Sequence, residues 1–284
     1  MKKLSLLGSA GMFGRDAEPV LISNGFSVTG GDLPEVDICD EGSLGRFLDE
    51  TEPDAVVNAA AYTNVDGAES HREEAFRINA EGAGKVAEVC RDRNIFLVHI
   101  STDYVFPGTK KEGYLPSDPP APAVNAYGES KLEGERAIIR TMRPGSYLIC
   151  RTQWLYGGHG KNFVDTIVDL ASSRDTLRVV DDQWGVPTHT ASLAFQIGRL
   201  LTDGASGVAH TVGGGGPVTW FTFAREIVRL SGASAEVLPC TTEEFPRAAR
   251  RPVYGWLRND SVPAAGVTDW KEDLAGYLSS LTER

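Results

Sequence analysis

The stretch Leu4-Ser5-Leu6-Leu7-Gly8-Ser9-Ala10-Gly11-Met12-Phe13-Gly14 decides the fold of this 284-residue chain. A short apolar strand runs directly into three glycines, Gly8, Gly11 and Gly14, and then into a helical segment. Such glycines allow a tight turn and a close approach of the backbone, so that a pyrophosphate can lie on free N–H groups at the positive end of the helix. A plain strand-to-helix turn needs only one of them. The stretch therefore predicts a dinucleotide-binding turn.

Short apolar runs and longer amphipathic segments alternate over the first half of the chain. Helices of this length between strands indicate an α/β fold with a Rossmann-like, doubly wound parallel sheet. Pro19 lies inside the first helical segment and should kink that helix or delay its start. The expected strands are Leu4–Leu7, Ser27–Thr29, Ala55–Asn58, Phe96–Ile100 and Tyr147–Cys150, and the best helices are Glu73–Asp92 and Ala126–Met142.

From about residue 152 the pattern changes to scattered short elements. We interpret residues 1–151, with part of 185–212, as the dinucleotide-binding domain, and residues 152–184 and 213–284 as a smaller, interleaved C-terminal substrate lobe. Gly213–Gly216 is expected to be a flexible turn, although it could also approach a ligand. Helices are expected at Phe163–Ser172, Ala191–Leu201, Thr222–Leu230 and Asp269–Leu281.

Composition excludes several classes of function. The formal net charge of -11 argues against a surface that binds nucleic acid, which needs clustered Lys and Arg. The apolar stretch near the N-terminus is too short for a signal peptide, and no later run suffices to span a membrane, so we expect a cytoplasmic protein. Four scattered cysteines and five histidines without metal-ligand spacing predict reduced thiols and no metal site.

Asp32 follows the second expected strand, where an acidic residue can accept hydrogen bonds from the ribose hydroxyls of adenosine. The residues after it, Leu33–Asp37, contain no Lys or Arg. A 2′-phosphate would therefore meet carboxylates and no counter-charge, so we predict that NADH is preferred over NADPH. The alternative interpretation of Asp32 is a solvated acid in a turn.

Tyr127 and Lys131 lie four residues apart on an expected helix, which puts a phenol and an ammonium on one face. A cation near a tyrosine favours the phenolate and lowers its pKa, which makes the phenol a better proton donor. The spacing alone also occurs on ordinary solvated helix faces. Its neighbours in the sequence decide between the two interpretations.

An ordered set of motifs extends over nearly the whole chain. The motifs are Asn58-Ala59-Ala60-Ala61-Tyr62-Thr63-Asn64-Val65-Asp66, Ser101-Thr102-Asp103-Tyr104-Val105-Phe106, Tyr127-Gly128-Glu129-Ser130-Lys131, Arg151-Thr152-Gln153-Trp154-Leu155-Tyr156, Asp182-Gln183-Trp184-Gly185-Val186-Pro187-Thr188 and Arg251-Pro252-Val253-Tyr254. In this order they resemble the extended short-chain dehydrogenase/reductases, more narrowly the dTDP-4-dehydrorhamnose reductase family. The resemblance implies reduction of the C4 ketone of dTDP-4-dehydro-L-rhamnose with NADH or NADPH, which gives dTDP-L-rhamnose.

The resemblance implies a role for each matching residue. Thr102 is expected to bond the substrate C4 oxygen, Tyr127 to give it a proton, and Lys131 to lower the pKa of Tyr127 and hold the nicotinamide ribose. Arg251 could contact the diphosphate or form a surface salt bridge. For Trp154 the alternative to a sugar contact is a place in the core. The implied cofactor-binding residues are Gly8, Gly11, Met12, Phe13, Gly14, Asp32, Asp37, Ile38, Ala61, Tyr62, Thr63, Tyr127 and Lys131, and the implied substrate-binding residues are Thr102, Asp103, Tyr104 and Trp154.

Some positions depart from the family pattern. Met12-Phe13 is bulkier than usual, and Tyr62 replaces a frequent His. Some relatives bind Mg²⁺ between subunits through glutamates. Here the first such position is Asp16, and no acid follows in His189-Thr190-Ala191-Ser192, so we predict that neither catalysis nor assembly depends on a metal. We expect a monomer or a homodimer.

Two other functions remain open at this point. One is a sibling 4-ketoreductase that acts on another dTDP-6-deoxy-hexulose, because the motifs do not separate these sugars. The other is a non-catalytic, nucleotide-binding regulatory subunit of the methionine adenosyltransferase type. The complete set of Thr102, Tyr127 and Lys131 argues for catalysis.

Overall fold

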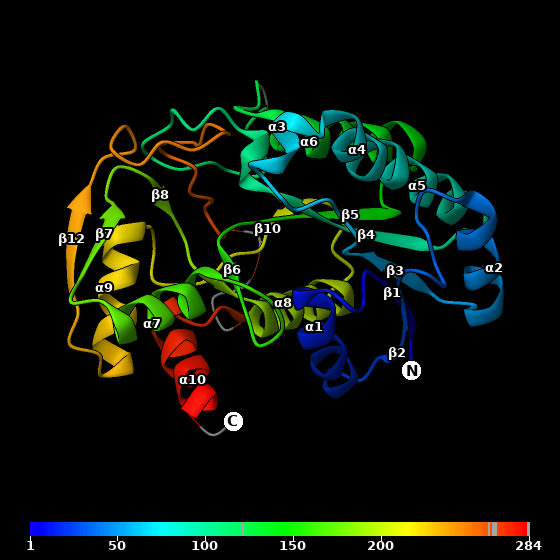
Figure 1. The fold of residues 1–284 in the computed structure, drawn as a ribbon. Helices are drawn as coiled ribbons and strands as arrows, with labels where there is room; N and C mark the ends of the chain where they lie inside the picture. The colour runs from blue at the N-terminus through cyan, green and yellow to red at the C-terminus, as the bar shows by residue number, and fades with distance from the viewer. Residues whose placement is uncertain (121, 261, 263–265, 283–284) are drawn as a thin grey trace.

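The computed structural model describes residues 1–120, 122–260, 262 and 266–282. At its centre is a six-stranded sheet in the order β10-β5-β4-β3-β1-β2, in which all neighbouring strands run parallel (Figure 1). The predicted doubly wound parallel sheet is confirmed, and β10 is a sixth strand that the sequence pattern does not predict. The strands are β1 (Lys3–Leu7), β2 (Ser27–Gly31), β3 (Ala55–Asn58), β4 (Phe96–Thr102), β5 (Tyr147–Thr152) and β10 (Gly207–His210).

Helices cover both faces of the sheet (Figure 1). On one face α1 (Met12–Ser23) packs against α8 (Thr190–Thr202), and on the other lie α2 (Glu41–Thr51), α5 (Ala83–Asp92) and α6 (Ala126–Thr141). Apolar strands buried on both faces are the reason that the sequence shows continuous apolar runs there. Pro19 lies inside α1, which nevertheless begins at Met12, so the predicted delay of this helix is wrong.

The helix expected over Glu73–Asp92 is divided into α4 (Arg72–Phe76), a π-helical segment η1 (Arg77–Gly82) and α5, and a short helix α3 (Gly67–Ser70) precedes them. The π-helical segment carries the buried Asn79, whose side chain accepts a hydrogen bond from Tyr62 N at 2.8 Å. The Asn79 amide also donates to Tyr62 O and to Ser130 Oγ on α6. The irregular turn thus ties the chain after β3 to the helix that carries Tyr127 and Lys131.

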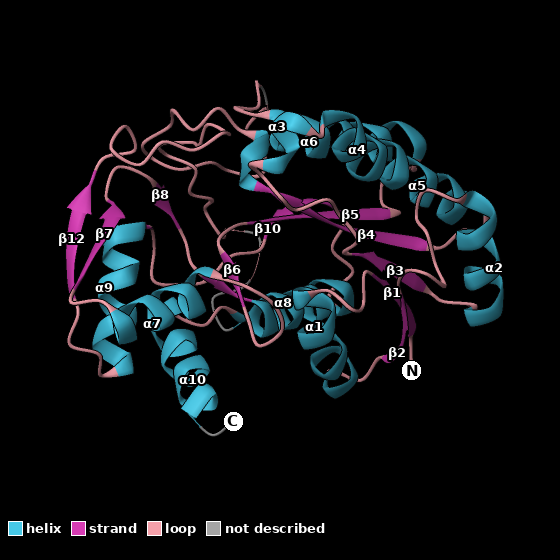
Figure 2. Cartoon of the chain, viewed as in Figure 1, coloured by secondary structure: helices cyan, strands magenta, loops and turns pink. Residues whose placement is uncertain are grey.

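A smaller lobe lies beside the sheet (Figure 2). It contains the parallel pair β7 (Thr176–Val180) and β12 (Glu236–Cys240), with α7 (Phe163–Ser173), α9 (Trp220–Ser231) and α10 (Trp270–Thr282) around a core that includes Phe223 and Trp270. Two small sheets join β6 (Leu155–Tyr156) to β9 (Thr188–His189) and β8 (Trp184–Gly185) to β11 (Val218–Thr219). A 3-10 turn, η2 (Asp103–Val105), follows β4.

The glycine run is held at Gly214 by backbone hydrogen bonds. Gly214 N donates to Thr268 O at 2.7 Å, and Trp270 N donates to Gly214 O at 3.2 Å. A Cβ at Gly213 would lie 2.4 Å from Pro187 O, so the run lets protein backbone segments approach each other. Among the described residues, no helix has both the length and the apolar character needed to cross a membrane.

Candidate active site

A cavity of about 1350 Å³ opens at the carboxyl ends of the sheet strands and is lined by both lobes. Ligands of open α/β sheets bind in this crevice. Tyr62 is the one predicted site residue outside the lining, because it packs beside Ala68, Ala75 and Ala126. The predicted residues that line the cavity are Gly8, Gly11, Met12, Phe13, Gly14, Asp32, Asp37, Ile38, Ala61, Thr63, Thr102, Asp103, Tyr104, Tyr127, Lys131 and Trp154.

The glycine turn forms one end of this cavity. Gly8 has a φ of 80°, and a Cβ there would lie 2.6 Å from Ala60 N. A Cβ at Gly14 would lie 2.3 Å from Gly8 O, so α1 could not pack this closely on the turn. Gly11 has more room, with its nearest neighbour Gly8 O at 3.3 Å. The turn therefore fits the close approach of a dinucleotide pyrophosphate to the N-terminus of α1.

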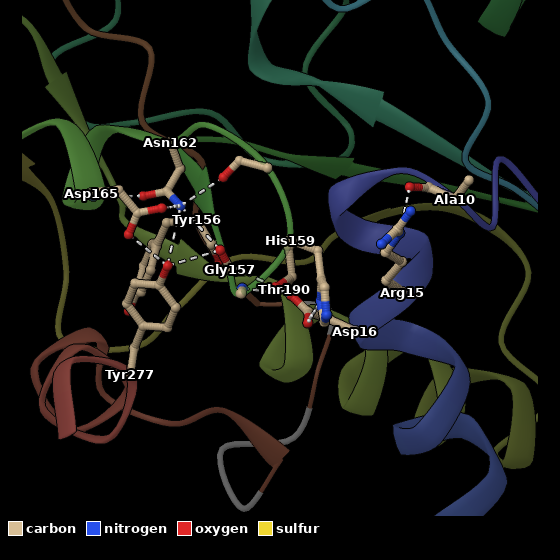
Figure 3. Close-up of polar contacts among 12 residues, drawn as sticks. Ala10, Arg15, Asp16, Tyr156, Gly157, His159, Asn162, Asp165, Thr190 and Tyr277 are labelled. Carbon is tan, nitrogen blue, oxygen red and sulfur yellow. Dashed lines mark hydrogen bonds and ion pairs between the residues drawn. The ribbon is translucent and has the colours of Figure 1, made fainter. Parts of the chain in front are cut away.

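The side chains of Asp32 and Arg15 both form hydrogen bonds with the backbone of Ala10 in the glycine turn. The Asp32 carboxylate accepts hydrogen bonds from Ala10 N and from Leu33 N, each at 2.8 Å. Arg15 Nε donates to Ala10 O at 2.9 Å, and its side chain lines the cavity (Figure 3). Each carboxylate oxygen keeps a lone pair free for a ribose hydroxyl. Arg15 is a cavity residue that the sequence motifs do not reveal.

The start of α6 brings Tyr127 to the end of β4. Asn125 caps the helix by accepting a hydrogen bond from Gly128 N at 2.8 Å. A Cβ at Gly128 would lie 2.3 Å from Tyr104 O, so only glycine allows α6 to pack this closely on η2. The Tyr104 and Tyr127 rings meet edge to face, with centroids 5.6 Å apart.

Burial dominates the electrostatics of this end of the cavity. It raises the pKa of Tyr127 to about 12, while a hydrogen bond with Thr102 acts in the opposite direction. Thr102 Oγ1 also donates to Asp103 Oδ1 at 3.1 Å. Burial raises the pKa of Asp103 to about 7, so this acid is partly protonated near neutrality. Tyr127 and Thr102 are thus in contact, as a shared role at one substrate oxygen requires.

The amino group of Lys131 contacts β4 in this structure. Its Nζ donates to Ile100 O at 2.7 Å and lies 3.2 Å from His99 Nε2. Burial lowers the pKa of Lys131 to about 8, and Glu135 on the same helix raises it. Burial and contacts on β4 thus set the environment of the Lys131 amino group.

Trp154 is partly buried against the core of the smaller lobe and also lines the cavity. Its backbone has a φ of 49°, a left-handed conformation that a bulky residue rarely adopts. Its ring stacks on Trp220 of α9, with centroids 3.5 Å apart and 12° between the planes. A Cβ at Gly185 would lie 2.3 Å from the Trp154 ring. Both indoles line the cavity, and Trp220 is a second residue that the motifs miss.

The loop 157–161 lies beside the glycine turn, contributes His159, Gly160 and Lys161 to the cavity lining, and is held by Asp16 of α1 (Figure 3). Asp16 accepts hydrogen bonds from Gly158 N at 3.2 Å and from Thr190 Oγ1, and it pairs with His159 Nδ1 at 2.9 Å. From the other side Tyr277 Oη donates to Gly157 O at 2.9 Å. Within the described residues, no group of His, Cys, Asp and Glu could hold a metal ion.

Arg251 lies outside the cavity lining and forms a partly buried ion pair instead of a surface one. Its guanidinium binds the Asp66 carboxylate through two nitrogens, at 2.5 and 2.9 Å, and also bonds the Tyr104 hydroxyl. The pair lowers the pKa of Asp66 to about 2. Arg251 therefore bonds the hydroxyl of the cavity residue Tyr104 without lining the cavity itself.

Comparison with known proteins gives the family. The model of the family described as RmlD substrate binding domain matches residues 1–283. The dTDP-4-keto-6-deoxy-D-glucose reductase of Streptomyces niveus is 42% identical over 262 residues, which cover 92% of this chain and 90% of that protein. The dTDP-4-dehydrorhamnose reductase of Streptomyces griseus is 39% identical over 282 residues, covering 97% and 90%.

A solved structure extends the match to three dimensions. The dTDP-4-dehydrorhamnose reductase of Bacillus anthracis strain Ames, in complex with NADP, is 35% identical, with a TM-score of 0.92 over 98% of this chain and 99% of that chain. The fold, the ordered motifs and the near-complete coverage agree with one another. This chain therefore belongs to the RmlD substrate binding domain family, and its resemblance to the dTDP-4-dehydrorhamnose reductases is confirmed.

Proposed function

We propose that this protein is an NAD(P)H-dependent reductase that converts dTDP-4-dehydro-L-rhamnose into dTDP-L-rhamnose. One observation carries the proposal. A single cavity is lined by the glycine turn with Asp32 at one end and by Thr102, Tyr127 and Lys131 at the other. Residues suited to a dinucleotide thus share one space with residues suited to proton transfer at a carbonyl.

The reduced nicotinamide would supply the hydride for C4 of the sugar. Tyr127 gives its phenolic proton to the developing C4 alkoxide: the phenol O–H bond breaks, the alcohol O–H bond forms, and a phenolate remains. Thr102 donates a hydrogen bond to the same oxygen and stabilises its charge. Lys131 holds the nicotinamide ribose. Proton transfer of this kind typically contributes about 10²–10⁴-fold to the rate.

The cofactor preference rests on the charges near the adenosine end. Asp32 presents a carboxylate where a 2′-phosphate would lie, and Leu33–Asp37 offers no cation. Arg15 and Arg77 line the same cavity, so NADPH should also bind. We propose that both cofactors are used and that NADH has the larger kcat/KM. A larger kcat/KM for NADPH would contradict this assignment of Asp32.

The sugar itself has one competing assignment. The Streptomyces niveus relative is named for reduction of dTDP-4-keto-6-deoxy-D-glucose and shares 42% identity with this chain. A 4-ketoreductase of another dTDP-6-deoxy-hexulose is therefore the second candidate. The face of the sugar that meets the nicotinamide decides the product, and we propose that Trp154, Asp103 and Tyr104 set that face.

We further propose that the protein works in the cytoplasm, where reduced nicotinamide cofactors are available, as a monomer or homodimer without a metal. At the position where some relatives have a metal-binding glutamate, Asp16 bonds a hydroxyl, an imidazole and a backbone N–H. We also propose that residues 1–151, with part of 185–212, form the dinucleotide-binding domain and that residues 152–184 and 213–284 form the substrate lobe. Loss of activity in EDTA, restored by Mg²⁺, would contradict the metal-free proposal.

The test is oxidation of NADH and NADPH by the purified protein with each 4-keto sugar nucleotide of a panel, followed by NMR of the product. We expect dTDP-4-dehydro-L-rhamnose to give the largest kcat/KM. Tyr127→Phe should lower kcat by about 10²–10⁴-fold. Tyr147→Phe is the matched control, because Tyr147 begins β5 at the end of the strand away from the cavity. No turnover of any sugar would overturn the reductase proposal and favour a non-catalytic binding subunit.

A further inference from the structure

A buried chain of polar side chains contacts Lys131 from the sheet. Lys131 Nζ lies 3.2 Å from His99 Nε2, and His99 Nδ1 lies 3.3 Å from Asn58 Nδ2. Asn58 Oδ1 in turn accepts a hydrogen bond from Ala60 N at 3.2 Å. Asn58 and His99 are register partners on β3 and β4, and all three side chains are at most 2% exposed. Water therefore does not complete these hydrogen bonds.

The hydrogen-bond geometry of Asn58, His99 and Lys131 restricts which of their nitrogens carry protons. Because Asn58 Oδ1 is taken by Ala60 N–H, the amide directs its N–H groups at His99 Nδ1, which must be the acceptor. A neutral imidazole has a single N–H, so the proton lies on Nε2 and is directed at Lys131 Nζ. An ammonium has no lone pair to accept it, whereas an uncharged amine has one. This arrangement therefore suits an uncharged Lys131.

A charged Lys131 requires the opposite arrangement. The ammonium needs His99 Nε2 as an acceptor, so the imidazole proton moves to Nδ1. Asn58 must then rotate its amide to present Oδ1 to that proton, and Ala60 N loses its acceptor. Ala60 lines the cavity beside Gly8, so the proton on Lys131 is linked to a peptide of the cofactor wall.

Among the described residues, no charged group near Lys131 replaces His99 as the partner of its amino group. On α6, Tyr127 and Glu135 lie four residues to either side of the lysine, and the Glu135 carboxylate forms a buried ion pair with Arg151 of β5 at 2.7 Å. From η2 come Asp103 and Tyr104, both within the cavity lining. Within the described residues, no carboxylate lies within ion-pair distance of Lys131 Nζ. Burial and the Lys131 charge both lower the pKa of His99, which excludes a doubly protonated ring as the solution.

We propose that His99 is a positioning residue for the reduction: its ring holds the Lys131 amino group, and its tautomer changes when that group gains or loses a proton. This inference rests on the proposed role of Lys131. The proposal also links the charge of Lys131 to the hydrogen bond of Ala60 N, a backbone group in the cavity lining.

The direct test is NMR of the full-length protein labelled with ¹⁵N-histidine and ¹³C-lysine, titrated from pH 6 to 10 with and without NADH. We expect His99 to change from the Nδ1–H to the Nε2–H tautomer with the same midpoint as the Lys131 ¹³Cε signal. A His99 ring that keeps one tautomer while Lys131 titrates would overturn the proposal. The measurement needs no turnover, so it stands even if the proposed substrate is wrong.

A pair of variants adds a kinetic test. In His99→Gln the amide can rotate to present its oxygen to the ammonium, so the alkaline limb of the kcat/KM profile should move up by about one pH unit. His210→Gln is the control, since His210 is equally buried but its Nδ1 bonds Arg258 O. A uniform loss of rate in His99→Gln, with the alkaline limb unmoved, would indicate a merely structural role and contradict the proposal.

Discussion

At the scale of single residues, Asp103 shows how burial changes an ordinary side chain. The acid is 2% exposed, and burial raises its pKa from 3.8 to about 7. Between these two values the native state binds more protons than the unfolded chain, so stability falls as the pH rises through this window. A neutral acid beside Thr102 and Tyr127 can also donate a hydrogen bond, which a carboxylate cannot do.

Asp103→Asn should therefore stabilise the protein at high pH. Asparagine is never charged and keeps an oxygen that accepts the hydrogen bond from Thr102. We expect the variant to gain up to about 4 kcal/mol over wild type at pH 8, with the difference vanishing below about pH 4. Urea unfolding at several pH values measures this. Equal stability of the two proteins at pH 8 would contradict the raised pKa.

Sequence motifs predicted residues of the cavity lining where a motif reports local backbone geometry. Gly8 and Gly14 are such residues, since a Cβ at either would lie less than 3 Å from backbone atoms. Tyr62 and Arg251 lie outside the cavity lining because their positions depend on packing against distant segments. No local pattern reports that Arg251 pairs with Asp66, 185 residues away.

At the scale of elements, α1 and the loop 157–161 are joined by one carboxylate. Asp16 bonds Gly158, His159 and Thr190, and its side chain is 13% exposed (Figure 3). A Cβ at Gly157 would lie 2.3 Å from Asp16 Oδ2, so the loop approaches α1 as closely as glycine allows. This contact keeps the loop over the end of the cavity where the glycine turn lies.

Asp16→Asn should loosen this loop. An amide lacks the charge and replaces one acceptor oxygen by a donor, which costs about 1–3 kcal/mol at a partly buried site. We expect a lower Tm and a several-fold higher Kd for NADH, with kcat changed less. Asp203→Asn, at the exposed end of α8, is the control and should leave both values unchanged. Unaltered cofactor binding in Asp16→Asn would show that the loop does not act on the cofactor.

Periodicity predicted the long elements well, because α6, α7, α8 and α9 differ from their predicted bounds by at most two residues. It missed the π-helical segment Arg77–Gly82, since one extra residue per turn leaves the apolar pattern readable as an ordinary helix. It also missed β10, a four-residue strand whose place depends on pairing with β5, almost sixty residues earlier. Such pairings are set by tertiary contacts.

At the scale of the whole molecule, the stacked indoles of Trp154 and Trp220 form the part of the smaller lobe that faces the shared cavity. Trp154 is the second residue after β5, and Trp220 is the first residue of α9. The left-handed backbone at Trp154 is a strained conformation that the surrounding packing maintains. The pair forms the wall of the cavity that the proposed sugar would contact.

Trp220→Ala should weaken sugar binding more than cofactor binding. Loss of an aromatic stacking partner is worth about 0.5–1.5 kcal/mol, so we expect KM for the sugar nucleotide to rise about 2–10-fold. The Kd for NADH should change less than twofold, because the glycine turn lies at the other end of the cavity. Trp256→Phe, where the indole bonds Lys111 O outside this cavity, is the control. Equal losses for both ligands would contradict this division.

The central claim is that the cavity delivers hydride from a reduced nicotinamide to C4 of a dTDP-4-keto sugar. The most direct measurement uses NADH deuterated at the transferable position of the nicotinamide, dTDP-4-dehydro-L-rhamnose and the wild-type protein, with NMR of the product. We predict one deuterium at C4 of dTDP-L-rhamnose. Cofactor oxidation with no deuterium at C4, or no oxidation with any 4-keto sugar nucleotide, would contradict the claim.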